Sequence, residues 1–186
     1  MHKIITENEW HAVYNLHDKS VEVNVANSLE VEIGKLLHER RMKLALAESC
    51  TGGLIGNRIT DVPGSSEFFW GSVVAYAYEA KVALLGVSWD TFNILGAVSR
   101  ETVLEMARGT RRVLVTDIGV SVSGIAGPGG GTDEKPVGTT WIGLAANDGE
   151  WARLFHFSGN RTQNKQAAAD AALQFLLDYL EGKLQT

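Results

Sequence analysis

Short, almost wholly apolar segments alternate with amphipathic ones along the first two thirds of the chain. Residues 43–47 (KLALA) and 116–127 (TDIGVSVSGIAG) contain few polar side chains, which is typical of strands buried on both faces of a sheet. Such strands need helices on both sides, so the alternation predicts an α/β fold. The pattern predicts helices at residues 27–41, 51–62, 99–112 and 161–181, and strands at 43–47, 116–127, 137–146 and 151–158. Residues 71–81 are predicted to form a further strand that runs into a turn or helix.

The last two predicted strands connect differently from the earlier ones. Asn147, Asp148 and Gly149 form a tight-turn signal between them, so residues 137–146 and 151–158 are expected to pair as a hairpin. Strands linked by helices, followed by a hairpin, predict a three-layer α/β/α sandwich with a mixed, mostly parallel sheet. We expect residues 1–26 to be an irregular N-terminal extension, and residues 27–186 to form a single domain.

The composition and charge of the chain argue against some classes of binding partner. The chain has 186 residues, with 17 Lys and Arg against 22 Asp and Glu, and this net charge of -5 argues against a general nucleic-acid binder. One cysteine permits no internal disulfide and suits a reducing compartment. Because we find no long apolar run and no signal-peptide pattern, we expect a cytoplasmic protein without a membrane partner. Trp10 in the N-terminal extension favours a homodimer.

The segment AESCTGG, residues 47–53, joins the first predicted strand to a helix and carries more reactive groups than a helix cap needs. In open α/β sheets ligands gather at the carboxyl ends of strands, where a helix N-terminus offers unpaired N–H groups to an anion or an oxyanion. Ser49 is therefore a candidate nucleophile, and Thr51, Gly52 and Gly53 are candidate substrate-binding residues. The alternative, that Ser49 or Thr51 is only an N-cap, stays equally open.

Residues 76–81 (YAYEAK) combine two tyrosines with a lysine. On a strand Tyr76 and Tyr78 would project to the same face, and Lys81 at its end could turn toward the same cleft. A lysine can take a proton from a hydroxyl only if burial or a cationic neighbour lowers its pKa well below about 10.4, and a tyrosine beside it can relay a proton to a leaving group. The residues alone favour the simpler interpretation, two half-buried aromatic side chains and a solvated lysine.

Residues 123–132 contain five glycines directly after a predicted strand. Their amides either form a concave anion-binding nest, which would include Ser123, Gly124 and Gly127, or belong to a surface loop. Further along, Arg161 lies in the first turn of the last predicted helix, where a cation does not help the helix dipole. Arg161 is thus either a phosphate ligand or an ordinary surface residue.

Two other kinds of site are less well supported. Cys50 lies beside Ser49 and is a second candidate nucleophile, but free cysteines are usually small buried apolar residues, and neighbours along a strand point apart. The five histidines show no ligand spacing, and no Cys/His cluster exists in the sequence, so we expect no metal site and no cofactor.

Taken together, these segments resemble the C-terminal domain of the competence- and damage-inducible CinA proteins. The resemblance covers about residues 28–182. It rests on seven motifs in the same order: residues 47–53 (AESCTGG), 63–66 (PGSS), 79–81 (EAK), 96–99 (GAVS), 123–128 (SGIAGP), 134–139 (EKPVGT) and 158–161 (SGNR).

The resemblance implies an amidohydrolase that converts nicotinamide mononucleotide to nicotinic acid mononucleotide and ammonia, without a cofactor. By its position, Ser49 matches the family's nucleophile, Lys81 its base, and Tyr76 a tyrosine placed between them. Arg161 matches an arginine near the substrate. The resemblance therefore implies that Ser49 and Lys81, far apart in the chain, meet at one rim of the sheet.

The chain departs from the family pattern at several positions. Tyr78 stands where the family usually has Asn, and Lys165 stands where a second Arg follows Arg161. Tyr78 would place a phenol near the presumed base, where it could narrow the pocket or alter the substrate. The alternative function is therefore a catalytically inactive homologue that binds a nucleotide or a protein partner through the same cleft.

Overall fold

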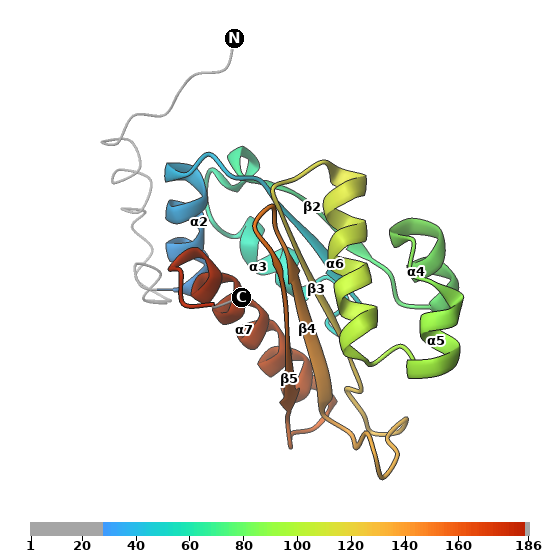
Figure 1. Ribbon diagram of the computed structural model, residues 1–186. Helices are drawn as coiled ribbons and strands as arrows, with labels where there is room; N and C mark the ends of the chain where they lie inside the picture. The colour runs from blue at the N-terminus through green and yellow to red at the C-terminus, as the bar shows by residue number, and fades with distance from the viewer. Residues whose placement is uncertain (1–27, 185–186) are drawn as a thin grey trace.

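The structure, a computed structural model, describes residues 28–184 and contains one five-stranded sheet (Figure 1). The strands are β1 (Leu44–Glu48), β2 (Phe69–Val74), β3 (Ile118–Gly124), β4 (Thr139–Ala145) and β5 (Glu150–His156), in the order β2-β1-β3-β4-β5. β1 pairs in parallel with β2 and β3, whereas β4 pairs antiparallel with β3 and β5. Four strands therefore run in one direction and β4 in the other. The expected extension at residues 1–26, with Trp10, lies outside the described residues.

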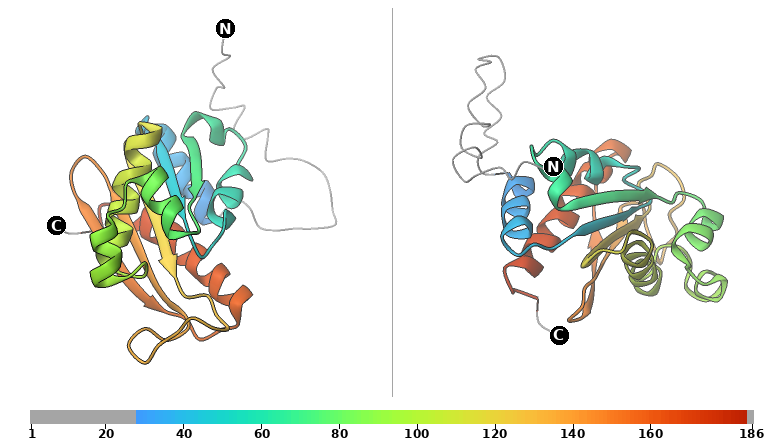
Figure 2. Two further views of the ribbon diagram at one scale, coloured as in Figure 1. Left: turned by 90° about the vertical axis from the view of Figure 1, so that its right-hand side faces the viewer. Right: turned by 90° about the horizontal axis from the view of Figure 1, so that it is seen from above.

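Helices cover both faces of the sheet, which confirms the predicted sandwich. One face carries α2 (Leu29–Glu39), α3 (Leu54–Thr60) and α7 (Arg161–Leu180); the other carries α4 (Tyr78–Leu85), α5 (Trp89–Leu95) and α6 (Arg100–Leu114). The view from above in Figure 2 shows blue α2 and red α7 separated by the sheet from the green and yellow helices. A short 3-10 turn, η2 (Ser65–Glu67), precedes β2.

The strand predicted within residues 71–81 runs into a helix, as expected, but it ends too early to carry the two tyrosines. β2 ends at Val74, and α4 begins at Tyr78. Tyr76 and Tyr78 therefore do not project from one strand face, and Lys81 lies in a helix. The neighbouring α5 was not predicted, because its seven residues are too few to show a helical period, although Ser88 caps it by accepting the Asp90 N–H.

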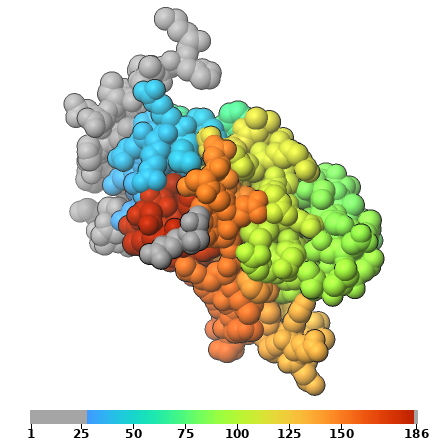
Figure 3. All heavy atoms as spheres, viewed as in Figure 1, coloured from blue at the N-terminus to red at the C-terminus, as the bar shows by residue number. Residues whose placement is uncertain are grey.

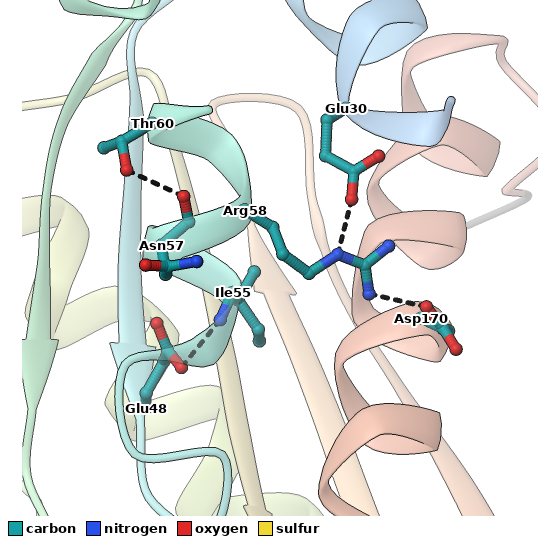
Figure 4. A network of polar contacts seen from close by, with 7 residues as sticks. All are labelled: Glu30, Glu48, Ile55, Asn57, Arg58, Thr60 and Asp170. Carbon is teal, nitrogen blue, oxygen red and sulfur yellow. Dashed lines mark hydrogen bonds and ion pairs between the residues drawn. The ribbon is translucent and has the colours of Figure 1, made fainter. Parts of the chain in front are cut away.

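An ion-paired arginine joins the three helices of the α2 side. The Arg58 guanidinium on α3 donates to Glu30 of α2 and to Asp170 of α7, each at 2.5 Å (Figure 4). Glu30 is buried, so its charge needs this partner. The interaction ties α3 to both of the other helices, and with it the loop that leads from β1 into α3.

The carboxylate of Glu48, the last residue of β1, holds the start of α3 in place. Its side chain is fully buried, and its oxygens accept five hydrogen bonds. Backbone N–H groups that a helix start normally leaves unpaired supply three of them. The donors are the N–H groups of Gly53, Ile55 and Gly56 at 2.9, 3.1 and 2.9 Å, and the hydroxyls of Thr51 and Ser72 at 2.7 and 2.9 Å.

Replacing this carboxylate should strongly weaken the fold. In Glu48→Gln an amide NH2 would face the buried donors, so we expect the free energy of unfolding to fall by about 3 kcal/mol. Urea denaturation followed by circular dichroism measures this change. Glu39→Gln at the exposed end of α2 is the matched control and should unfold like the wild type. An equal midpoint for Glu48→Gln and the wild type would contradict the assigned role.

Candidate active site

Ser49 follows β1 directly, at the carboxyl ends of the parallel strands. Its N–H donates to the carbonyl of Val122 on β3 at 3.1 Å, so its backbone continues the sheet by one residue. The chain then turns sharply through Gly52 and Gly53, whose φ angles of 65° and 98° favour glycine. This turn leaves the Ser49 side chain at the rim of the sheet, with 8% of the residue exposed.

Lys81 reaches Ser49 from the second turn of α4. Its Nζ donates to Ser49 Oγ at 2.9 Å, and to the carbonyl oxygens of Ala75 and Tyr76 at 2.8 and 2.9 Å. The lysine is 1% exposed, although the sequence alone favoured a solvated one. The proximity of Ser49 and Lys81 that the family resemblance implied is therefore confirmed.

The surroundings of Lys81 make its neutral amine more populated than that of an exposed lysine. All three acceptors of Nζ are uncharged, and burial lowers the pKa of Lys81 to about 8, with only a smaller opposing effect from Cys50. Close to neutral pH, a sizeable fraction of the amine can therefore accept a proton. A serine hydroxyl in contact with such an amine is the arrangement that activates a nucleophile.

Cys50 points away from this pair and is a poor nucleophile. Its side chain packs in the core cluster of the α2, α3 and α7 side, and burial raises the pKa of its thiol to about 11. Because the thiolate is the reactive form, Cys50 is unreactive at neutral pH. Of the two candidate nucleophiles, the geometry favours Ser49.

Tyr76 contacts Lys81 through its main chain and Arg161 through its side chain. Its carbonyl accepts from Lys81, whereas its phenol oxygen accepts from Arg161 Nη2 at 2.9 Å. Arg161 Nη1 donates to the carbonyl of Gly127 at 2.7 Å. The phenol therefore lies at the mouth of the site, where the residue is 60% exposed.

A second cation on α7 flanks the turn after Ser49. Lys165 lies one helical turn after Arg161, and its Nζ is 3.8 Å from the position that a Cβ on Gly52 would occupy. Buried Asn164 fixes this end of α7, since it accepts from the Gly159 N–H and donates to the Ala126 carbonyl. Within residues 28–184, neither Arg161 nor Lys165 forms an ion pair.

Several of the groups that the sequence predicted for anion binding already have hydrogen-bond partners within the protein. The N–H of Gly53 and the hydroxyl of Thr51 are bonded to Glu48, so the open start of α3 that the sequence suggested is not found. Ser123 is buried and donates to the Ala97 carbonyl at 2.7 Å, and Gly124 packs against Thr140. In contrast, residues 128–134 form an exposed loop at the lower edge in Figure 1, so an anion nest there stays a prediction.

Two further expectations concern metals and membranes. In the part of the chain that the structure describes, no group of three or more His, Cys, Asp or Glu side chains could hold a metal ion. In residues 28–184, no helix is both long and apolar enough to cross a bilayer.

Comparison with known proteins shows which family the chain belongs to. Residues 26–180 match the family described as CinA C-terminal domain. The chain belongs to this family. A CinA-like protein from Desulfosudis oleivorans is 51% identical over 159 residues, which cover 85% of this chain and 38% of that protein. A CinA-like protein from Chlorobium limicola is 47% identical over 159 residues, covering 83% and 37%. The chain thus spans less than two fifths of these relatives.

Solved structures of CinA-type proteins share the fold. The competence/damage inducible protein from Agrobacterium tumefaciens is 35% identical, with a TM-score of 0.77, and the match covers 82% of this chain and 95% of that one. The competence damage-inducible protein A from Klebsiella pneumoniae is 33% identical, with a TM-score of 0.80 and the same coverage.

Tyr78, the departure from the CinA pattern, is accommodated by packing against α5. Its ring stacks on Phe92 with centroids 4.8 Å apart, and Trp89 meets the same Phe92 edge-on at 5.8 Å. The unexpected helix α5 thus provides the surface on which this larger side chain rests.

The buried lysine should make the stability of this CinA C-terminal domain depend on pH. Its folded-state pKa of about 8 lies below the ordinary value of 10.5, so between these values the unfolded chain binds the extra proton. The free energy of unfolding therefore rises with pH across this window. Between pH 7 and 9 the wild type should gain roughly 1 kcal/mol relative to Lys81→Met.

Urea denaturation of both proteins at each pH provides the measurement, and the exposed Lys35→Met serves as the matched control. A constant difference between wild type and Lys81→Met over this range would mean that Lys81 keeps an ordinary pKa.

Proposed function

We propose that this CinA C-terminal domain is an amidohydrolase that converts nicotinamide mononucleotide to nicotinic acid mononucleotide and ammonia. One observation carries the proposal: a buried amine with a pKa lowered to about 8 lies 2.9 Å from the hydroxyl of Ser49. A structural lysine gains nothing from such burial, since desolvation makes its charged form costly. The choice of substrate rests on the family resemblance.

The first half-reaction forms an ester on Ser49. Neutral Lys81 Nζ accepts the hydroxyl proton while Ser49 Oγ bonds to the carboxamide carbon, giving a tetrahedral oxyanion. When the C–N bond breaks, the nitrogen takes a proton and leaves as ammonia. We assign the transfer of that proton to Tyr76 on the basis of the family resemblance. Its phenol oxygen accepts from Arg161, which leaves its own O–H to donate.

The second half-reaction returns the enzyme to its starting state. Lys81, neutral again, accepts a proton from water as the water oxygen bonds to the ester carbon. Collapse of this intermediate breaks the bond to Ser49 Oγ, which recovers a proton from Lys81. The product is a carboxylic acid, and water is the only other reactant.

Arg161 and Lys165 are suited to hold the phosphate of the substrate. They lie one turn apart on α7, at the mouth of the site, and neither is neutralised by a carboxylate among the described residues. Guanidinium and ammonium groups are the usual protein ligands of phosphate. With the phosphate bound here, the carboxamide would extend inward to Ser49.

The chemistry is tested by removing the hydroxyl. With nicotinamide mononucleotide as substrate, Ser49→Ala should lower kcat by roughly 10³-fold or more, because no acyl-enzyme can form. Ammonia release and chromatography of the nicotinic acid product measure the rate.

Cys50→Ala is the matched control, since it removes the adjacent thiol and leaves the serine in place; it should retain most of the activity. If Cys50→Ala is inactive and Ser49→Ala active, the nucleophile is the thiol. If the wild type binds nicotinamide mononucleotide without releasing ammonia, the alternative of an inactive binding homologue is correct.

Phosphate recognition is tested by comparing two substrates. Lys165→Gln should raise KM for nicotinamide mononucleotide by about tenfold with less effect on kcat, since it removes a charge-assisted contact to the bound phosphate. Arg161→Gln should raise KM similarly and also lower kcat, because Arg161 holds the Tyr76 phenol. For nicotinamide riboside, which has no phosphate, Lys165→Gln should match the wild type in kcat/KM, and Arg161→Gln should show only the loss in kcat. An equal loss with both substrates would show that these cations do not act through the phosphate.

A further inference from the structure

A second cationic site lies at the opposite end of the strands from Ser49. A cleft of about 600 Å³ opens between the last turns of α6, the loop into β3 and the β4–β5 turn; its lining includes Arg108, Arg111, Arg112, Asp117, Asn147 and Glu150. We name it the arginine cleft. Figure 3 shows the yellow end of α6 beside the orange β4–β5 turn on this face. The three arginines follow the i, i+3, i+4 spacing, which places them on one face of α6.

Arg111 is held rigidly by uncharged oxygens. Its guanidinium donates to the carbonyls of Thr116 and Ala146, both at 3.2 Å, and to the side-chain amide oxygen of Asn147. These bonds fix the direction of the group without cancelling its charge. An arginine oriented in this way loses little conformational freedom when an anion binds.

The charges in the cleft divide into paired and unpaired ones. Arg108 and Glu150 form an ion pair at 2.7 Å, and the Asp117 carboxylate accepts the Lys43 N–H at 2.7 Å. Among the described residues, Arg112 donates only to the Leu85 carbonyl, at 3.2 Å. Within residues 28–184, Arg111 and Arg112 form no ion pair. Asp117 forms none either, because a backbone N–H does not cancel the charge of its carboxylate. The cleft therefore presents two unpaired guanidinium groups and one unpaired carboxylate.

We propose that the arginine cleft binds a small phosphorylated molecule. The guanidinium groups of Arg111 and Arg112, which have no carboxylate partner, outnumber the one unpaired carboxylate, Asp117, so the lining keeps a net positive charge that attracts an anion. Planar guanidinium groups also suit the geometry of phosphate oxygens. The cleft volume lies within the range of about 300 to 1,000 Å³ typical of small-molecule sites, so it has room for more than a free phosphate.

Glycerol 3-phosphate is the probe, added to the full chain at constant ionic strength and followed by ¹H–¹⁵N NMR. Amides of residues 116–118 and 147–150 should shift in a saturable manner, separately from any shift near residues 50–53. Arg112→Gln should raise the dissociation constant measured from the amides of residues 116–118 and 147–150 by about tenfold. Glu150→Gln should tighten it several-fold, because this change frees Arg108 and removes a negative charge.

Arg153→Gln on β5, whose guanidinium pairs with Asp178, is the matched control and should bind like the wild type. Acetate, a monoanion, should bind at least tenfold more weakly than the probe. The proposal is overturned if residues 116–118 and 147–150 do not shift, or if Arg112→Gln and Glu150→Gln bind like the wild type. Because the two sites report on different amides, this result is independent of the reaction proposed at Ser49.

Discussion

The buried carboxylate of Glu48 is the interaction on which the rest of the active site depends. Five hydrogen bonds converge on it from the turn after β1, from the start of α3 and from β2. Without them the first N–H groups of α3 would be buried and unpaired, which costs more than most single contacts contribute. Glu48 thus fixes where β1 ends and where Ser49 stands.

The alternation of side chains along β1 then places the adjacent Glu48 and Ser49 on opposite faces of the sheet, where they have different roles. Successive side chains of a strand point to opposite faces of the sheet. Leu46 and Cys50 pack in the cluster of the α2, α3 and α7 side, whereas Ala47 packs with residues of α4 and α6. By the same parity Glu48 caps α3 on one face, and Ser49 meets Lys81 of α4 on the other face. The dense run of polar residues in AESCTGG therefore serves two sides of the sheet, with the candidate nucleophile on the α4 side.

The sequence predicted features that depend on short-range patterns. The apolar runs located β1 and β3, Ser99 marked the start of α6, where it accepts the Thr102 N–H, and residues 147–149 marked the hairpin. The contact of Ser49 with Lys81 came from family resemblance, because 32 residues separate them and no local rule joins them.

The features that sequence reasoning missed depend on distant partners. Glu48 was not identified as the cap of α3, since caps normally lie within the turn they stabilise, and Glu48 reaches Gly56, 8 residues on. Tyr76 was placed on a strand because its apolar neighbours continue the alternation of β2, yet its phenol is fixed by Arg161, 85 residues away. The arginine cleft requires the β4–β5 turn to meet α6, which only the folded chain brings about.

The distribution of charge suggests what kind of ligand the molecule selects. The chain is acidic overall, yet two pairs of cations without an ion-pair partner among the described residues lie close together: Arg161 and Lys165 near Ser49, and Arg111 and Arg112 at the opposite end of the sheet. A local positive site in an acidic surface attracts a small anion that fits inside it. An extended polyanion such as a nucleic acid must also lie along the surrounding carboxylates, which repel it. Two small cationic sites in an acidic chain therefore favour phosphorylated metabolites over polymers, in agreement with a nucleotide-sized substrate at Ser49.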